Sequence, residues 1–151
     1  MFNIRQVLKS TYALIVPNDA STTTIPGWDG AKVQVLAAPA MGCEFVEYLI
    51  TVNKESKVAV PIQPHPEYVF YILEGNGVLE KEGKKYPLEV GSYGYLPPKT
   101  AWKINGTSEE AMKFLMVKKR YEPIGPELPA FIVGLDRETP ETPRQPGRAM
   151  K

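Results

Sequence analysis

The chain has 151 residues, 43% of them hydrophobic, and a formal net charge of +1 from 18 basic and 17 acidic side chains. This size and apolar content predict one domain with a single core. The balanced charge argues against a nucleic-acid partner or an anionic membrane surface. No apolar run approaches the length of a membrane span, and the first residues lack the apolar core of a secretory signal. A single cysteine, Cys43, cannot form an internal disulfide, so we expect a cytoplasmic protein.

Short apolar stretches separated by Pro and Gly follow one another along the chain, which is the pattern of an all-β protein. The chain has 15 Pro and 12 Gly, and the stretches between them are rich in the aromatic and β-branched residues that favour strands. We predict strands at residues 12–16, 32–37, 44–52, 68–73, 78–81, 84–88, 92–96 and 112–117. Short strands at this close spacing predict a sandwich or a barrel.

Dipeptides ending in Gly provide the turn signals between these strands. Glu82-Gly83 separates two predicted strands and indicates a hairpin turn. Asn76-Gly77 and Asn105-Gly106 indicate further turns, because Asn and Gly tolerate positive φ. Residues 108–112 show the only hint of a helical turn.

The end of the chain has a different composition. Residues 136–148 contain Pro140, Pro143 and Pro146 and show no apolar periodicity, which predicts an extended linker or arm. We therefore predict one barrel domain with N-terminal strands in residues 1–135, followed by a Pro-rich C-terminal arm in residues 136–151.

Two segments carry a resemblance to a known fold. YVFYILEGNG at residues 68–77 and GSYGYLPPKTAW at residues 91–102 resemble the two signature segments of the cupins. The resemblance implies a double-stranded β-helix, a jelly-roll barrel with little helix. It also implies a metal held by three His and one Glu from these segments, whereas the chain contains one histidine, His65.

The positions where the resemblance would place metal ligands carry other residues. The Glu position, seven before Gly75, is Tyr68, and the third His position, eleven after Gly91, is Trp102. The two remaining His positions fall within residues 61–64, which read PIQP. Such groups are not ordinary ligands for borderline metals, so we expect no metal and no cofactor in this barrel.

His65 and Glu67 are the candidates left for an unusual metal site. A metal site normally needs three or more protein ligands, and His65 stands between two prolines in a predicted loop. Glu67 is one residue out of register with the Glu position, and a shift of one residue in a strand turns a side chain to the opposite face. The basic run Lys118-Lys119-Arg120 is interpreted as a solvated strand end.

Strand alternation divides the first segment into two faces. Tyr68, Phe70 and Ile72 share the inward face, and Val69, Tyr71 and Leu73 share the outward face. Large inward aromatics can pack a filled barrel, the commoner use of aromatic clusters, or line a pocket for a small organic ligand. The residues predicted for such a pocket are Tyr68, Phe70, Ile72, Tyr95 and Trp102. We predict no catalytic residue.

Further segments extend the resemblance to residues 12–134. They include IPGW at 25–28, APAMG at 38–42, KRYEP at 119–123 and PAFIVG at 129–134. In this order they resemble the N-terminal half of the (S)-ureidoglycine aminohydrolases, bicupin enzymes of allantoin and ureide breakdown. The resemblance implies metal-assisted C–N hydrolysis with release of ammonia, by a manganese ion whose His, Glu and Gln ligands belong to the second barrel. None of those ligands falls on a residue of this chain.

Two hypotheses of function follow. The first is a degenerate, metal-free cupin module that is not catalytic and that dimerises, supports a second cupin domain or subunit, or binds a small molecule. The second is a small-molecule hydrolase of aminal or amidine bonds, active alone through His65 and Glu67 or together with a second barrel. The missing histidines favour the first. Outward apolar residues such as Val69, Tyr71 and Leu73 predict a two-fold symmetric homodimer.

Overall fold

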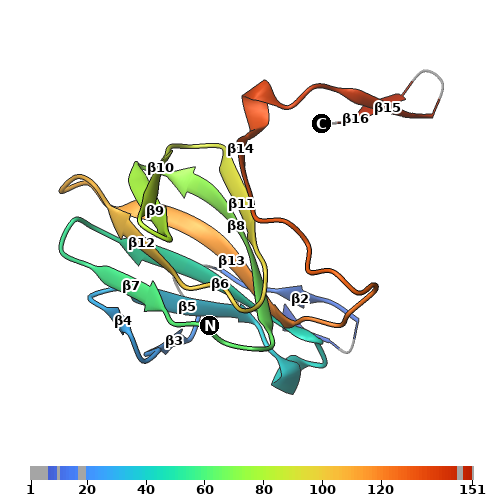
Figure 1. Ribbon diagram of the computed structural model, residues 1–151. Helices are drawn as coiled ribbons and strands as arrows, with labels where there is room; N and C mark the ends of the chain where they lie inside the picture. The colour runs from blue at the N-terminus through green and yellow to red at the C-terminus, as the bar shows by residue number, and fades with distance from the viewer. Residues whose placement is uncertain (1–6, 10, 17–19, 146–147, 151) are drawn as a thin grey trace.

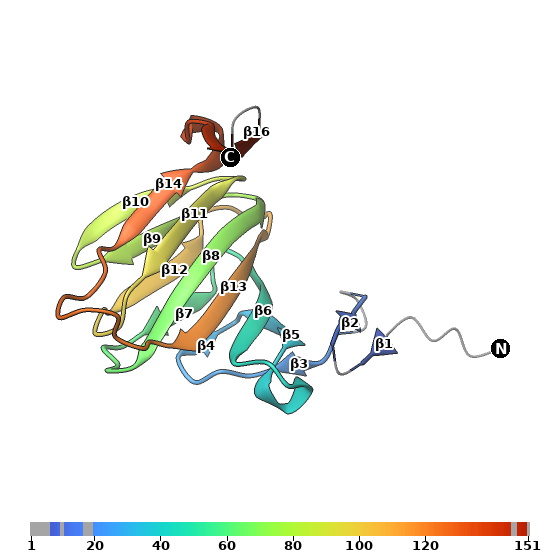
Figure 2. The same cartoon turned by 90° about the vertical axis from the view of Figure 1, so that its right-hand side faces the viewer.

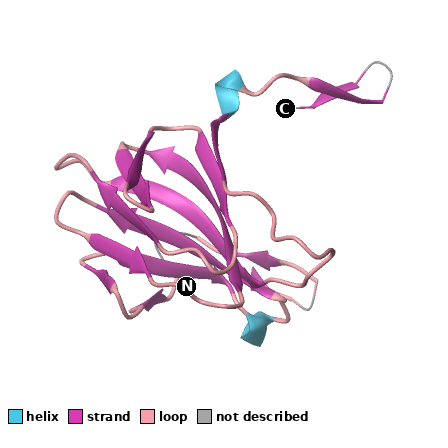
Figure 3. Cartoon of the chain, in the orientation of Figure 1, coloured by secondary structure: helices cyan, strands magenta, loops and turns pink. Residues whose placement is uncertain are grey.

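The computed structural model describes residues 7–9, 11–16, 20–145 and 148–150. Nearly all regular structure in these residues is β, as Figure 3 shows. Two antiparallel sheets face each other around one core (Figures 1 and 2). The predicted all-β barrel is therefore confirmed. None of the helices among the described residues has the length and hydropathy of a membrane span.

The larger sheet has seven strands. In order across the sheet they are β14 (Ile132–Leu135), β11 (Ser92–Leu96), β8 (Pro66–Glu74), β13 (Met112–Arg120), β6 (Phe45–Val52), β5 (Lys32–Ala37) and β3 (Thr22–Thr23). The five-stranded sheet contains β10 (Lys84–Leu88), β9 (Gly77–Lys81), β12 (Trp102–Gly106), β7 (Lys57–Val60) and β4 (Trp28–Asp29). Strands distant in sequence are therefore neighbours in both sheets.

Two small hairpins and two short 3-10 helices complete the described structure. The hairpins pair β1 (Val7–Leu8) with β2 (Ala13–Leu14) and β15 (Thr142–Gln145) with β16 (Arg148–Met150). The helices are η2 (Pro39–Met41) and η3 (Asp136–Glu138). Figure 1 shows the β15–β16 hairpin projecting away from the barrel.

Turn chemistry explains one of the hairpins and corrects two predictions. Glu82 and Gly83 both have positive φ, 52° and 78°, and they connect β9 to β10 as predicted, in the manner of a two-residue hairpin turn. Asn105 and Gly106 do not form a turn; they lie in β12 and pair with β9. Residues 108–112 are not helical, because bends there lead directly into β13.

Period-two alternation directs every second side chain of the long strands into the core. On β8 the buried residues are Tyr68, Phe70 and Ile72, each at most 4% exposed. Gly94 of β11 lies opposite Phe70 in the register, and a side chain at Gly94 would collide with the Phe70 ring. The glycine thus lets the aromatic ring lie across the neighbouring strand.

The outer face of the seven-stranded sheet is apolar and exposed. Val69, Tyr71 and Leu73 of β8 are 49%, 36% and 37% exposed, and Ile132 of β14 is 49% exposed. The predicted outward direction of the three β8 side chains is confirmed. Leu115 of β13 lies opposite Tyr71 on this face.

The start of the C-terminal arm is attached to this outer face. Asp136 donates its backbone N–H to the carbonyl oxygen of Gly91 at 3.0 Å. Side-chain contacts join Tyr71 to Asp136 at 2.6 Å, Arg137 to Glu89 at 2.9 and 3.2 Å, and Tyr93 to Thr139 at 2.9 Å. The arm therefore leaves the barrel from a fixed point.

Candidate functional site

Four aromatic side chains pack together in the barrel core and against it, and two of them, Tyr68 and Trp102, stand where the cupin resemblance would place metal ligands. Tyr68 of β8 and Trp102 of β12 meet edge to face, with ring centroids 5.2 Å apart. Trp28 of β4 contacts Trp102 at 6.3 Å and Tyr48 of β6 at 6.1 Å. Such edge-to-face pairs are favoured by the ring quadrupoles. We call Trp28, Tyr48, Tyr68 and Trp102 the aromatic cluster; it connects the two sheets.

The aromatic cluster leaves little open space. The cavity beside it measures about 50 Å³ and is lined by Trp28, Tyr48 and Tyr68 together with Gln63 and Lys118. Sites for small organic ligands usually enclose roughly 300–1,000 Å³, whereas a space of this size suits one or two water molecules. The volume favours the packing interpretation of these rings over a ligand pocket.

The polar atoms of the aromatic cluster are neutral groups. Burial, with a smaller effect of the nearby Tyr48, raises the pKa of Tyr68 to about 12. Burial also raises the pKa of Tyr48. The Trp102 indole N–H is buried and has no hydrogen-bond partner in the described part of the protein. Neutral phenols and an indole donor cannot replace imidazole and carboxylate ligands, so these residues do not fit a metal.

The structure brings four of the five predicted pocket residues together. Tyr68, Phe70, Ile72 and Trp102 are all buried in the same core. Tyr95 lies on the opposite face of the sheet, paired with Val69. The alternation of β11 gives the reason: Ser92, Gly94 and Leu96 are the buried positions, so Tyr95 faces outward.

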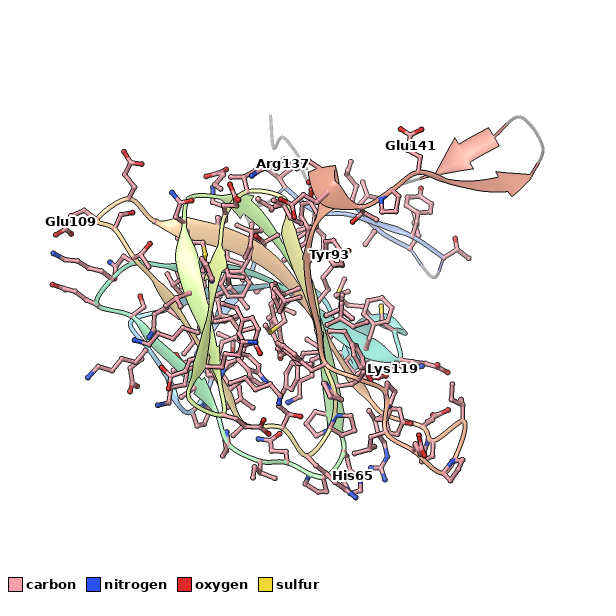
Figure 4. All side chains as sticks on the ribbon, turned by 45° about the horizontal axis from the view of Figure 1, so that its top comes forward. His65, Tyr93, Glu109, Lys119, Arg137 and Glu141 are labelled. Carbon is pink, nitrogen blue, oxygen red and sulfur yellow. The ribbon has the colours of Figure 1, made fainter. Side chains whose placement is uncertain are left out.

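The two candidate metal ligands are not part of the aromatic cluster. His65 is exposed in the loop before β8, and Figure 4 shows it at one end of the molecule, with Glu109 and Arg137 toward the other. Its backbone carbonyl accepts a hydrogen bond from the Tyr121 N–H at 2.8 Å. Glu67 accepts a hydrogen bond from the Tyr95 hydroxyl at 2.8 Å. In the part of the chain that the structure describes, no group of three or more His, Cys, Asp or Glu side chains could hold a metal.

Lys118 lies near the end of β13, as predicted for the basic run, but its side chain approaches the aromatic cluster. It is half-buried, and its ammonium group lies 5.9 Å from the centre of the Tyr68 ring, a cation–π distance. Met112, Phe114 and Met116 are the buried residues of β13. Continuing that alternation by one step turns Lys118 inward, which is the signal that could have revealed it.

Comparison with known proteins shows which proteins this chain is similar to. The family model of the Cupin domain matches residues 48–118. A "Probable (S)-ureidoglycine aminohydrolase" of Oryza sativa is 32% identical over 142 residues, covering 92% of this chain and 45% of the relative. The "(S)-ureidoglycine aminohydrolase" of Escherichia coli is 27% identical over 132 residues, covering 86% of this chain and 51% of the relative.

A solved structure shows the same architecture. The crystal structure of protein Ylba from Escherichia coli superimposes with a TM-score of 0.82 at 27% identity, covering 92% of this chain and 58% of that chain. The chain spans about half the length of the curated relatives it matches. The superposition and the family model give the chain the cupin fold. Along most of its length the chain resembles the (S)-ureidoglycine aminohydrolases in sequence.

Proposed function

We propose that this chain is a metal-free cupin barrel, not itself catalytic, that pairs with a second copy of itself through the outer face of the seven-stranded sheet. The observation that carries the proposal is the exposed apolar strip on that face. Val69, Tyr71 and Leu73 of β8 and Ile132 of β14 are each at least 36% exposed. Contiguous apolar surface of this kind is typical of an interaction site.

The outer face has the composition of a protein interface. Tyr93 and Tyr95 of β11 and Leu115 and Val117 of β13 flank the β8 side chains and are partly buried. Aromatic residues are enriched in protein interfaces, where they combine apolar area with a polar tip. A two-fold axis through the sheet would bring the same strip of both copies together and close the assembly at two subunits.

The barrel interior supports a role that is not catalytic. The aromatic cluster fills the place where a cupin would bind metal and substrate, and about 50 Å³ is left beside it. Buried Tyr68 and Trp102 stand at two of the expected ligand positions. A barrel filled in this way contributes stability and surface to an assembly.

Molar mass in solution tests the pairing. We expect light scattering at micromolar concentration to report twice the mass of one chain. Val69→Lys should give a monomer, because it places a charge at the centre of the apolar strip. Val90→Lys is the matched control: Val90 is 53% exposed and lies in the turn between β10 and β11, outside the strip. A monomeric wild-type protein, or a dimer that Val69→Lys leaves intact, would refute the proposal.

A second candidate function rests on the names of the relatives. Two matching proteins are called (S)-ureidoglycine aminohydrolase, which favours a role in allantoin catabolism as part of a C–N hydrolase. In that case a second barrel would supply the manganese. Ammonia release from ureidoglycine, measured for the chain alone with and without added manganese, separates the two: we expect none, and metal-dependent turnover would establish the hydrolase.

A further inference from the structure

A cleft opens at the rim of the barrel beside the aromatic cluster. It encloses about 370 Å³ between the first residues of β6, the first residues of β8 and the last residues of β13. Tyr48, Gln63 and Lys118 line both this cleft and the small interior cavity. The volume lies within the range of small-molecule sites, roughly 300–1,000 Å³.

Positive charge gathers in this cleft. Lys118, Lys119 and Arg120 all line it, and so does His65. Consecutive residues at the end of β13 both reach the cleft: Lys118 lies opposite Val46 of β6 and Tyr68 of β8, and Lys119 lies opposite Phe45 of β6. Figure 4 shows Lys119 on the same half of the molecule as His65.

Little negative charge opposes these cations. Glu44 is the one carboxylate that lines the cleft. Glu67 is opposite Lys119 in the register; its carboxylate, which accepts the Tyr95 hydrogen bond, does not line the cleft. Among the residues described, the ion pairs involve other cations, on β9, β12, β13, η3 and the loop after β6, and none includes Lys118, Lys119 or Arg120.

Apolar residues also line the cleft. They are Pro39, Phe45, Val46, Tyr48 and Pro66. The Gln63 side chain, which can donate and accept hydrogen bonds, stands among them. A ligand matched to this cleft has a negatively charged group at one end and a small planar or apolar body.

We propose that the rim cleft binds a small organic carboxylate. The carboxylate group contacts Lys118 and the adjoining Lys119 and Arg120, because charge-assisted hydrogen bonds to ammonium and guanidinium groups are the stronger ones. The apolar body of the ligand lies against Val46 and Tyr48. The inference does not depend on pairing of barrels, since it uses the strand ends and not the apolar strip.

The single histidine makes the site observable. His65 is the one histidine of the chain and it lines the cleft, so untagged protein gives one imidazole signal in a proton–carbon NMR spectrum. Benzoate serves as the probe, and benzamide as a neutral molecule of nearly the same shape. We expect saturable shifts of the His65 signal with benzoate and none with benzamide. Equal shifts with both, or no saturation with benzoate, would overturn the proposal.

Variants distinguish binding at a specific site from nonspecific electrostatic attraction of the anion. Lys118→Met should weaken benzoate binding about tenfold, the usual effect of losing one charge-assisted hydrogen bond. Lys118→Arg keeps the charge and should retain most of the affinity. Lys32→Met, at an exposed lysine of β5, is the matched control and should leave binding unchanged.

A second probe tests the class of ligand, and a second variant serves if Lys118→Met does not fold. Inorganic phosphate that shifts His65 as strongly as benzoate would mean a general anion patch and would contradict the organic carboxylate. Should Lys118→Met fail to fold, Arg120→Met at an exposed position replaces it, with a severalfold loss of affinity expected. Unchanged affinity in that variant would equally refute the proposal.

Discussion

The Tyr95 hydroxyl donates a hydrogen bond to the Glu67 carboxylate at 2.8 Å, on the outer face of the seven-stranded sheet. The sequence suggested Tyr95 for an interior pocket and Glu67 for a metal site, and the structure joins them to each other instead. Burial, the hydrogen bond and the charge of Glu67 raise the pKa of Tyr95. The pair stands at the edge of the apolar strip that we assign to barrel pairing.

The Tyr95–Glu67 pair should contribute modestly to stability. A double-mutant cycle with Tyr95→Phe and Glu67→Gln, followed by urea unfolding, should give a coupling energy of less than about 1 kcal/mol, because the pair is partly exposed and screened by solvent. Salt should reduce the coupling further. A coupling of several kcal/mol would show that the pair is buried in the assembled protein.

Trp102 should be among the most sensitive positions of the barrel. It is 2% exposed and contacts Tyr68 and Trp28. Trp102→Ala should lower the free energy of unfolding by roughly 3–5 kcal/mol, since it leaves a cavity in the core. Trp102→Phe keeps part of the packing and removes the unpaired N–H, so it should cost clearly less. Denaturant unfolding measures both, and equal losses would argue against a packing role.

The buried tyrosines should make the protein sensitive to alkaline pH. The folded-state pKa of Tyr68 is raised to about 12, and that of Tyr48 is also raised, in both cases chiefly by burial. A raised pKa favours the neutral folded form, so the stability they contribute is fully present below about pH 10, the ordinary tyrosine value, and is lost as the pH rises through the folded values.

Unfolding midpoints should therefore be flat below about pH 10 and fall between about pH 10 and 12. Tyr68→Phe should remove part of that fall, at most about 2 kcal/mol. Phenolate absorbance offers a second measurement, because Tyr48 and Tyr68 should titrate above the ordinary tyrosine value. A single transition of all tyrosines near pH 10 in folded protein would contradict this.

The attachment of the C-terminal arm should depend on Asp136. Its hydrogen bond to Tyr71 is the main cause of the raised pKa of Tyr71, so Asp136→Ala should lower that pKa toward its ordinary value. The same change should speed hydrogen exchange in residues 136–145 while leaving the thermal midpoint of the barrel nearly unchanged. Glu138→Ala, at an exposed residue of η3, is the control. Loss of barrel stability in Asp136→Ala would contradict a purely local attachment.

Much of the barrel could be predicted because its strands are bounded by strong local signals. The strands at residues 32–37, 84–88 and 92–96 have the predicted bounds, and each begins or ends near a Gly or Pro. By contrast, β12 escaped prediction because Asn105-Gly106 suggested a turn. A side chain at Gly106 would come within 2.8 Å of the Asn53 backbone, so this glycine serves close packing, which only the folded structure reveals.

The candidate site was predictable only in part, because tertiary packing brings some of its residues together. Tyr68 and Trp102 could be assigned to the interior from the two motifs and strand alternation. Trp28 and Tyr48 belong to strands β4 and β6, outside the two cupin signature segments, and tertiary packing alone unites them with Trp102. Lys118 was hidden in a run of three cations, where charge obscured the alternation of β13.

The position of the two tryptophans determines which structural changes tryptophan fluorescence can detect. Trp28 and Trp102 are the only tryptophans, and their rings are 6.3 Å apart in the core. All tryptophan fluorescence therefore originates from one pair of rings on the five-stranded sheet, which contact Tyr48 and Tyr68 of the facing sheet. Separation of the two sheets should change the tryptophan emission. Rearrangement of the C-terminal arm, or of the loop around His65, should leave the tryptophan emission unchanged.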